Sequence, residues 1–359
     1  MFPVLKVKNK KSKLIIDPVS GIWHLVSYFS PLLLLLIILS LLYSCDRREE
    51  VVLSGHTMGT TYRVKVVAGY FQATAGLQEK IDKRLADINQ SMSTYLNQSE
   101  ISRFNRFGKT GEKFVVSEDF IRVMQVAEKV YTASEGAWDG TLGPIVNLWG
   151  FGAKGRKARV PHSEDILQQL KNVGFHRLIR VDGRYLIKSN PLVTLDFASI
   201  AKGYGVDQVA EVIRASGFNN YLVEIGGEVF ASGVRIDGEP WRIGVNTPRK
   251  DASIQQVFKV ATLKNRAMAT SGDYRNFFEI DGKRYSHVID PRNGYPVANG
   301  VVSVSITAES CTFADGLATA VMVMGPEKGL ALVNQLEQVE GLIIVDDGGT
   351  LVKYASDNF

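Results

Sequence analysis

Three Asp-Gly pairs constrain the fold of this chain more than any other local feature of its sequence. They are Asp182-Gly183 within 177–188, Asp281-Gly282 between 277–280 and 283–286, and Asp347-Gly348 near the end of the chain. An Asp-Gly pair between alternating polar and apolar residues predicts a two-residue hairpin turn, because that turn needs positive φ. The chain is therefore expected to contain antiparallel sheet in several separate places.

Predicted helices are interspersed with these hairpins. Apolar residues at helical spacing predict an amphipathic helix over about 75–94 and another around 120–130, and a run of small residues predicts a third over 314–324. Period-two alternation over 62–66 and the β-rich run 301–307 predict strands. No linker rich in Pro, Gly or Ser divides the chain after residue 51, so we expect one α+β domain over 51–359, with mostly antiparallel sheet and packed helices.

The first 44 residues have the composition of a membrane-targeting segment. Five lysines precede the apolar run 31–42, and Leu42-Tyr43-Ser44-Cys45 resembles a bacterial lipobox. We therefore expect a signal peptide over 1–44, a lipidated Cys45, and a short charged linker over 45–50. The run is shorter than the roughly 20 residues of a membrane span, but including 22–30 would allow one, so an uncleaved anchor is the alternative. If Cys45 is acylated, Asp46 beside it resembles an inner-membrane retention signal, so we expect the protein at the periplasmic face of the bacterial inner membrane.

Charge and cysteine content exclude some classes of function. The chain has 42 Lys and Arg against 37 Asp and Glu, a net charge of +5. Residues 1–44 contain five lysines and one acidic residue, so they hold most of this excess and the rest is nearly neutral. A nearly neutral domain argues against nucleic acid as a partner. Two cysteines are too few for a disulfide framework or a cysteine-rich zinc site.

The segment Leu195–Tyr204 is the first candidate for a functional site. It has the pattern of a strand end that runs into a helix, and a helix N-terminus suits a phosphate because its N–H groups are free. Lys202, one turn into the helix, could add a positive charge. The alternative is structural: Asp196 or Ser199 caps the helix and Lys202 is solvated.

Asp315 and Thr319 form the second candidate. If 314–324 is helical, their spacing of four places both side-chain oxygens on one face, where they could share a hard cation such as Mg²⁺. Mn²⁺ accepts the same oxygen ligands. A helix cap or a surface aspartate would explain Asp315 equally well.

Two further segments carry chemistry-bearing residues. His287 ends a predicted hairpin strand beside the Asp290-Pro291 turn, a suitable place for an acid–base group, although a lone histidine is more often structural. The loop Gly136–Gly152 contains five glycines and two tryptophans. Such a loop could hold a planar ring system, or it could be a rigid turn of the core.

Taken together, the motifs of this chain resemble the ApbE family, whose members are FAD:protein FMN transferases. The resemblance covers about 51–355 and rests on six segments that occur in the family's order. These segments are 57–62, 138–152, 195–207, 269–274, 286–296 and 314–320.

The resemblance implies a role for particular residues. His287 would be catalytic, and the metal would be bound by a main-chain oxygen of Ser199 and by the side chains of Asp315 and Thr319. The residues that would contact the flavin nucleotide are Met58, Tyr95, Ala137, Trp138, Asp139, Asp196, Lys202 and Ile289.

The resemblance also implies an activity: Mg²⁺-dependent transfer of the FMN part of FAD to a threonine hydroxyl of an acceptor protein, with release of AMP. In the family the acceptors include subunits of the sodium-pumping NADH:quinone reductase and of the Rnf complex, which carry a Ser/Thr-Gly-Ala-Thr-like motif. Three alternatives stay open on the residues alone: an FAD pyrophosphatase that yields FMN and AMP, a flavin-binding redox carrier, and a lipoprotein with a structural role.

Overall fold

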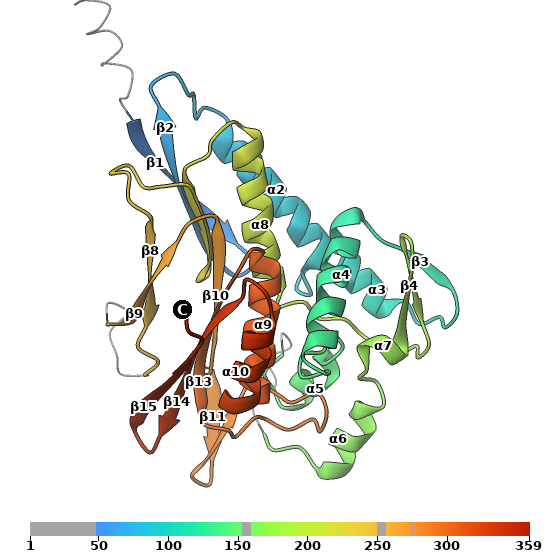
Figure 1. The fold of residues 1–359 in the computed structure, drawn as a ribbon. Helices are drawn as coiled ribbons and strands as arrows, with labels where there is room; N and C mark the ends of the chain where they lie inside the picture. Colours follow the sequence, from blue (N-terminus) through green and yellow to red (C-terminus); the bar gives the residue numbers. More distant parts are fainter. Residues whose placement is uncertain (1–47, 153–158, 250–255, 274–275) are drawn as a thin grey trace, which may run out of the picture. The chain divides into compact units, whose positions relative to one another are not determined.

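An eight-stranded sheet is the largest element of the computed structural model, which describes residues 48–152, 159–249, 256–273 and 276–359 (Figure 1). The strand order is β1-β2-β6-β7-β10-β13-β14-β15, and every neighbouring pair from β2 onward is antiparallel. The strands are β1 (Arg48–Thr57), β2 (Thr60–Gly69), β6 (Tyr221–Ile225), β7 (Glu228–Ser232), β10 (Arg266–Gly272), β13 (Val301–Ala308), β14 (Glu340–Asp347) and β15 (Thr350–Ala355).

Smaller sheets account for the remaining strands. A three-stranded sheet has the order β3-β5-β4, and β8–β9 and β11–β12 are separate hairpins. Their bounds are β3 (Lys113–Val115), β4 (Ile179–Asp182), β5 (Tyr185–Lys188), β8 (Trp241–Asn246), β9 (Val257–Leu263), β11 (Phe277–Ile280) and β12 (Lys283–Ser286). All three hairpins that the Asp-Gly pairs predict are present, and Asp281 and Gly282 have the positive φ values of 52° and 72° that this turn requires.

The helices include the three that apolar spacing predicts. Their bounds are α2 (Leu77–Met92), α3 (Glu100–Arg106), α4 (Glu118–Ala133), α5 (Gly143–Leu148), α6 (Ser163–Leu170), α7 (Phe175–Leu178), α8 (Ala201–Ala215), α9 (Cys311–Met324) and α10 (Pro326–Gln335). The prediction of a mixed α+β fold with mostly antiparallel sheet is confirmed. Among the described residues, no helix is both long enough and apolar enough to cross a membrane.

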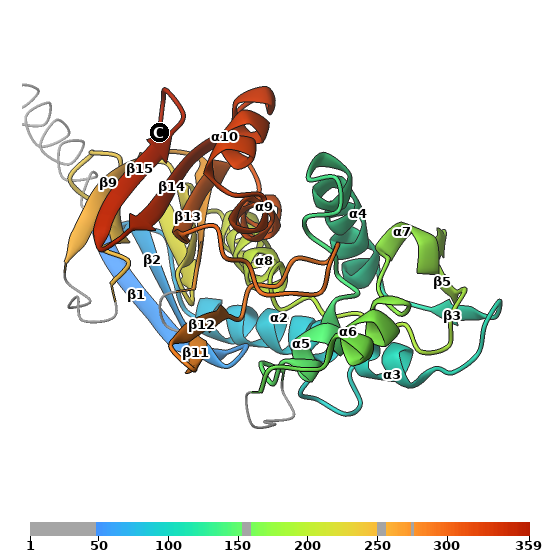
Figure 2. The ribbon, with the colours of Figure 1, turned by 90° about the horizontal axis from the view of Figure 1, so that it is seen from below.

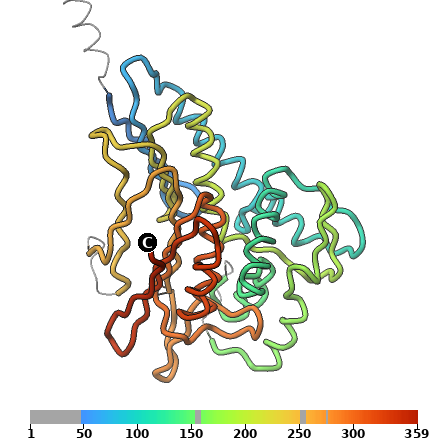
Figure 3. Tube along the Cα trace, viewed as in Figure 1, coloured from blue at the N-terminus to red at the C-terminus, as the bar shows by residue number. Residues whose placement is uncertain are grey.

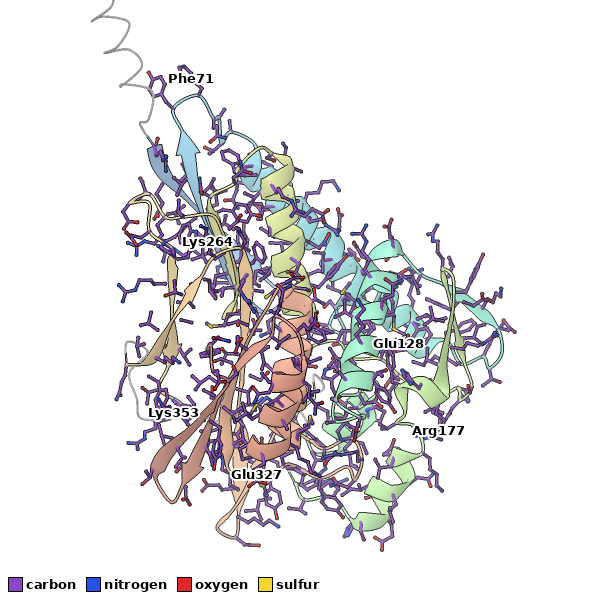
Figure 4. All side chains as sticks on the ribbon, in the orientation of Figure 1. Phe71, Glu128, Arg177, Lys264, Glu327 and Lys353 are labelled. Atoms are coloured by element: carbon purple, nitrogen blue, oxygen red, sulfur yellow. The ribbon has the colours of Figure 1, made fainter. Side chains whose placement is uncertain are left out.

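Both faces of the large sheet are covered, as the view from below shows (Figure 2). Strand β13 is buried along all eight of its residues because Val304 and Ile306 face a core shared with α9, whereas Val302 faces the β8–β9 hairpin. Burying each such side chain contributes about 1.5–3 kcal/mol. On the outer surfaces, charged side chains such as Glu128, Lys264 and Lys353 are exposed (Figure 4).

Helices α8 and α9 lie side by side although about a hundred residues separate them in the chain (Figure 3). Gly203 permits this approach, since a Cβ there would lie 2.4 Å from the carbonyl oxygen of Cys311. Asp207 of α8 also accepts hydrogen bonds from the backbone N–H groups of Cys311 and Thr312 at the start of α9, at 2.8 and 2.9 Å. This packing brings the first turn of α8 next to the middle of α9.

Three local predictions were wrong. Arg48–Glu50, expected in the linker, begin β1, where Glu50 pairs with Lys65 at 2.8 Å. Residues 193–197 are not a strand. There the Asn105 side chain takes the place of a strand neighbour by bonding both the N–H and the carbonyl of Leu195, at 2.7 and 2.8 Å.

The third wrong prediction concerns where the first predicted hairpin begins. Arg177 and Leu178 belong to the short helix α7, so the hairpin begins at Ile179. Residues 1–44 and Cys45, for which we expect a signal peptide and a lipidation site, lie outside the described residues.

Candidate active site

One cavity of about 430 Å³ collects nearly all of the predicted site residues. Its wall is built from the loop before α5, the start of α8, the end of β10, the segment after β12 and the middle of α9. The predicted residues that line it are Tyr95, Ala137, Trp138, Asp139, Asp196, Ser199, Lys202, His287, Ile289, Asp315 and Thr319. Segments more than 200 residues apart in the chain therefore meet at one place.

Met58 is the predicted flavin contact that does not line this cavity. It occupies the first turn position between β1 and β2, with φ of 49°, and it is partly buried. Its side chain lies against Gly205 of α8, where a Cβ would come within 2.9 Å of the methionine methyl group. In this structure Met58 therefore packs against α8, the helix that carries Lys202.

Lys202 is an ion-paired residue of the cavity wall. Its Nζ lies 2.7 Å from Oε1 of Glu228, the first residue of β7, whose side chain is only 2% exposed. Burial lowers the pKa of Lys202, but the Glu228 and Asp315 carboxylates outweigh it, so the net shift is upward. The structural alternative for this segment was wrong, because α8 begins after Ile200 with no side-chain cap and Lys202 is not free in solvent.

Asp315 and Thr319 occupy one face of α9, as their spacing predicts. Asp315 is 3% exposed, and its Oδ2 accepts a hydrogen bond from the Gly203 N–H at 2.9 Å. Thr319 Oγ1 lies 3.0 Å from Ser271 Oγ of β10. Asp315 is neither a surface residue nor the helix cap, which is Ser310. Burial raises the pKa of Asp315, and Lys202 opposes this shift.

The oxygen donors around Asp315 fit a magnesium ion better than a transition metal. The described residues contain no group of three or more His, Cys, Asp and Glu side chains arranged to hold a metal. Mg²⁺ is commonly bound by one or two carboxylates and completes its shell with water and substrate phosphates, so this sparse set of hard oxygens suits it. The Ser199 hydroxyl accepts a hydrogen bond from Trp138 Nε1 at 2.9 Å, and the contact that the family resemblance predicts for a metal is the main-chain oxygen of Ser199.

The glycine-rich loop serves both the cavity and the core. Trp138 lines the cavity, whereas Trp149 is fully buried and donates from Nε1 to the Gly294 carbonyl at 2.8 Å. The Asp139 carboxylate accepts hydrogen bonds from the N–H groups of Thr141 and Phe175, at 2.7 and 3.0 Å. The carboxylate thereby holds the loop in shape, while the residue as a whole borders the cavity.

His287 follows β12 and faces the cavity with one ring nitrogen committed to the protein. Its Nδ1 lies 3.0 Å from the carbonyl oxygen of Asn276. A carbonyl can only accept, so Nδ1 carries the proton and the neutral ring keeps an unprotonated Nε2. Burial lowers the pKa of His287, which favours this neutral form. Asp290, its neighbour in the motif, is bound to Arg292 at 2.7 Å and does not orient the imidazole.

Tyr95 and Asp196 also belong to the wall. Tyr95 is 76% exposed, so its ring is largely free to meet a ligand. Asp196 Oδ1 accepts a hydrogen bond from the Ala198 N–H at 2.9 Å, and burial raises the pKa of Asp196. Ile289 is 3% exposed and forms an isolated bridge with Pro296.

The sequence did not identify Glu228, Ser271 or Asn276 as site residues. Glu228 follows the Gly226-Gly227 turn, where a glutamate is ordinarily a solvated residue. The sequence held only an indirect signal for Glu228: a lysine near the buried N-terminus of a helix needs a carboxylate partner. Ser271 lies inside one of the six family segments, but its contact with Thr319 depends on the packing of β10 against α9.

Comparison with known proteins identifies the family of this chain. The model of the ApbE family matches residues 58–343. The FAD:protein FMN transferase of Vibrio cholerae is 44% identical over 324 residues, which cover 89% of this chain and 95% of the relative. The one from Haemophilus influenzae is 40% identical and covers 88% of this chain and 92% of the relative.

Solved structures agree with these relatives. The flavin transferase ApbE from Vibrio cholerae matches with a TM-score of 0.80 at 43% identity, over 87% of this chain and 99% of the other. The apo form of the Pseudomonas stutzeri flavinyl transferase ApbE matches with a TM-score of 0.79 at 38% identity, over 87% and 96% of the two chains. Sequence, fold and the segments that meet at the cavity agree, and the chain belongs to the ApbE family.

Proposed function

We propose that this protein transfers the FMN part of FAD to a threonine hydroxyl of an acceptor protein and releases AMP. Its relatives at 40–44% identity are named FAD:protein FMN transferases. Within the cavity, the observation that carries the proposal is the state of His287, whose Nδ1 is committed to the Asn276 carbonyl while Nε2 remains a base. A base, an ammonium group and a buried carboxylate around one cavity are the groups that phosphoryl transfer to a hydroxyl requires.

The reaction balances without a redox partner. The threonine oxygen forms a bond to the phosphorus on the FMN side of the pyrophosphate, and the bond from that phosphorus to the bridging oxygen breaks. AMP leaves with the bridging oxygen, and FMN stays attached to threonine through a phosphoester. His287 Nε2 takes the hydroxyl proton, a contribution of about 10²–10⁴-fold to the rate. Lys202 supplies a positive charge toward the phosphates, and Glu228 holds the lysine in place.

A divalent cation completes this site in the proposal. Asp315, Thr319 and the main-chain oxygen of Ser199 would hold Mg²⁺, with Mn²⁺ as the other hard cation that these oxygens accept. Such an ion supplies electrostatic stabilisation of the charge on the phosphate oxygens. Gly203 orients the Asp315 carboxylate by donating to Oδ2, so this ligand is fixed before any ion arrives.

The acceptor and the location are further parts of the proposal. The acceptor is a protein with a Ser/Thr-Gly-Ala-Thr-like motif, such as a subunit of the sodium-pumping NADH:quinone reductase or of the Rnf complex. The enzyme acts at the periplasmic face of the bacterial inner membrane, held there by lipid on Cys45. The basic and apolar leader of the sequence supports this location, and mass spectrometry of the mature N-terminus tests it.

The function is tested by mixing the purified protein with FAD, Mg²⁺ and a candidate acceptor, and by recording flavin fluorescence on the acceptor after denaturing electrophoresis. We expect fluorescence that is lost with EDTA and with an acceptor whose motif threonine is alanine. Rapid AMP release without any acceptor would instead favour an FAD pyrophosphatase. Intact FAD with reversible bleaching that needs no metal would favour a redox carrier.

A further inference from the structure

One oxygen of the cavity wall is buried and has no protein partner. Glu228 uses Oε1 to bind Lys202 at 2.7 Å, but its Oε2 makes no hydrogen bond to any described residue. A buried acceptor that is left unpaired is destabilising, and more so when the group is charged. Buried oxygens in this state are uncommon, and each calls for a specific explanation.

Glu228 is held too firmly for the unpaired oxygen to be an accident of a mobile side chain. It follows a tight turn in which Gly226 and Gly227 have φ of 61° and 109°, and it pairs with Ile225 in the β6–β7 ladder. The Glu224 side chain closes the turn by accepting from the Gly227 N–H at 2.8 Å. Gly226 also permits close packing against β2, because a Cβ there would lie 2.9 Å from Thr60 Cγ2.

The groups around Oε2 determine which kind of ligand group can bind to it. Glu228 lines the same cavity as Asp315 and His287. A second metal ion is disfavoured, because the Lys202 ammonium already lies 2.7 Å from the other oxygen of this carboxylate. Burial raises the pKa of Glu228, and the Lys202 ammonium opposes that shift. In its carboxylate form Glu228 repels an anion. What remains is a neutral hydrogen-bond donor, and a hydroxyl is the donor that a carboxylate accepts in the shortest bonds.

We propose that Glu228 is a substrate-contacting residue whose Oε2 accepts a hydrogen bond from a sugar hydroxyl next to the phosphates of FAD, while Oε1 positions Lys202 for those phosphates. This proposal rests on the proposed function and deepens it. If Lys202 meets the pyrophosphate, the hydroxyls within reach of Glu228 are those attached closest to the phosphates. On the FMN side they belong to the ribityl chain, and on the AMP side to the ribose.

The ribityl chain fits the cavity better. Trp138 and Phe151 form flat apolar parts of the same wall, which suit the ring system to which the ribityl chain is joined. Glu228 borders the same cavity beside Lys202, so its carboxylate would contact the polyol that connects the ring system to the phosphates. It would therefore make the enzyme specific for a ribityl flavin, not for any planar group on a pyrophosphate.

The test compares how tightly the wild type and the enzyme variants bind FAD and its analogues when no acceptor protein is present. Calorimetry measures the affinity for FAD and for analogues in which one ribityl hydroxyl or one ribose hydroxyl at a time is replaced by hydrogen. The wild-type protein should bind one ribityl analogue about 10–100-fold more weakly than FAD, the penalty for leaving a buried acceptor unpaired. Glu228→Ala should bind FAD and that analogue about equally.

Two further variants separate contact from positioning. Lys202→Met removes the ion pair but keeps Oε2, so it should weaken binding of all the dinucleotides and still discriminate against the same analogue. Glu224→Ala alters the same hairpin outside the cavity wall and should keep the wild-type ratio. Thermal unfolding of every variant, together with the isosteric Glu228→Gln, checks that the fold is intact.

Each result has a defined meaning. Equal discrimination by the wild type and Glu228→Ala would overturn the contact and leave the transferase proposal standing. Discrimination against a ribose analogue, and against no ribityl analogue, would overturn the assignment to the ribityl chain. Failure of the wild type to bind FAD at all would overturn both this proposal and the proposed function.

Discussion

Two networks of buried or partly buried charged groups meet at α8, and they differ in whether their oxygens are satisfied. On one side, Asp119 of α4 accepts hydrogen bonds from Arg84 at 2.6 Å and from Tyr204 at 2.6 Å, and Gln208 accepts another from Arg84 at 2.6 Å. On the other side, Lys202, Glu228 and Asp315 border the cavity, and Glu228 keeps one oxygen unpaired among the described residues.

The difference separates a structural network from a binding network. In the Asp119 network, the arginine and tyrosine donors saturate the carboxylate and connect α2, α4 and α8. In the Glu228 network, two carboxyl groups share one ammonium, burial raises the pKa of both, and one Glu228 oxygen is an acceptor with no partner among the described residues. A protein tolerates such an imbalance at functional sites, where a ligand completes it. Changes to the two networks should therefore affect different properties of the protein.

The largest expected effects are on catalysis, and Asp315→Ala is the first of them. This change removes the carboxylate in the proposed metal set, and loss of such electrostatic stabilisation costs about 10³-fold in rate. The fold should stay intact, because α9 keeps its cap at Ser310 and its apolar contacts. Loss of the acceptor for the Gly203 N–H should cost about 1–3 kcal/mol in the free energy of unfolding. FMN transfer and thermal unfolding, measured on one preparation, check this. An active Asp315→Ala would remove the distinction between the two networks.

His287→Asn should lower the rate of FMN transfer by about 10²–10⁴-fold, because asparagine is not a base. It should leave FAD affinity close to that of the wild type. Since burial lowers the pKa of His287, the neutral base persists to lower pH than for an exposed histidine. The rate should therefore fall only as pH drops below that lowered pKa, and this acidic limb should be absent from the pH–rate profile of the variant. An identical limb in both proteins would assign it to another group.

Asp119→Ala should act on stability and spare catalysis. It removes the shared acceptor of Arg84 and Tyr204, a loss of about 1–3 kcal/mol in the free energy of unfolding. The Arg84 hydrogen bonds hold the pKa of Asp119 below its usual range, so its contribution is present above an ordinary aspartate pKa of about 4 and is lost as pH falls further. Urea unfolding at pH 7 and below pH 4 measures this. A variant that loses transfer activity while remaining folded would contradict the structural role.

The smallest effect is expected from Trp138→Phe. Phenylalanine keeps an aromatic ring in the cavity wall but cannot donate to Ser199, a bond of 2.9 Å in the wild type. Loss of one such hydrogen bond is worth about 0.5–1.5 kcal/mol, or about 2–10-fold in transfer rate. Steady-state kinetics with FAD as the varied substrate resolve a change of this size. A loss as large as that of Asp315→Ala would mean that Ser199 depends on the indole for more than orientation.

Local sequence patterns were sufficient for the hairpins and the long helices, because turn chemistry and apolar spacing act within a few residues. The Asp281-Gly282 turn and the 3.6-residue period of α2 are examples. The segment at Leu195 was read as a strand end, since nothing local reveals that the Asn105 side chain takes the place of a strand neighbour.

The candidate site was predictable as a set of segments and not as a network of contacts. The family resemblance named eleven residues of the cavity wall, whereas local reasoning alone left Lys202 and Asp315 with plain structural explanations. Neither the family resemblance nor local reasoning identified Glu228. Its burial arises only when α8 packs against β7 and Gly203 lets α8 approach α9. Such long-range packing has no signature in a short window of sequence.

The most direct measurement of the central claim is the stoichiometry of a single turnover with limiting FAD, Mg²⁺ and excess acceptor. AMP is quantified by chromatography, and FMN on the acceptor by intact mass. We expect one acceptor-bound FMN for each AMP released. Both products should be lost together in Asp315→Ala, and both should form more slowly in His287→Asn. Release of AMP with all of the FMN free in solution, while the acceptor remains unmodified, would contradict this expectation.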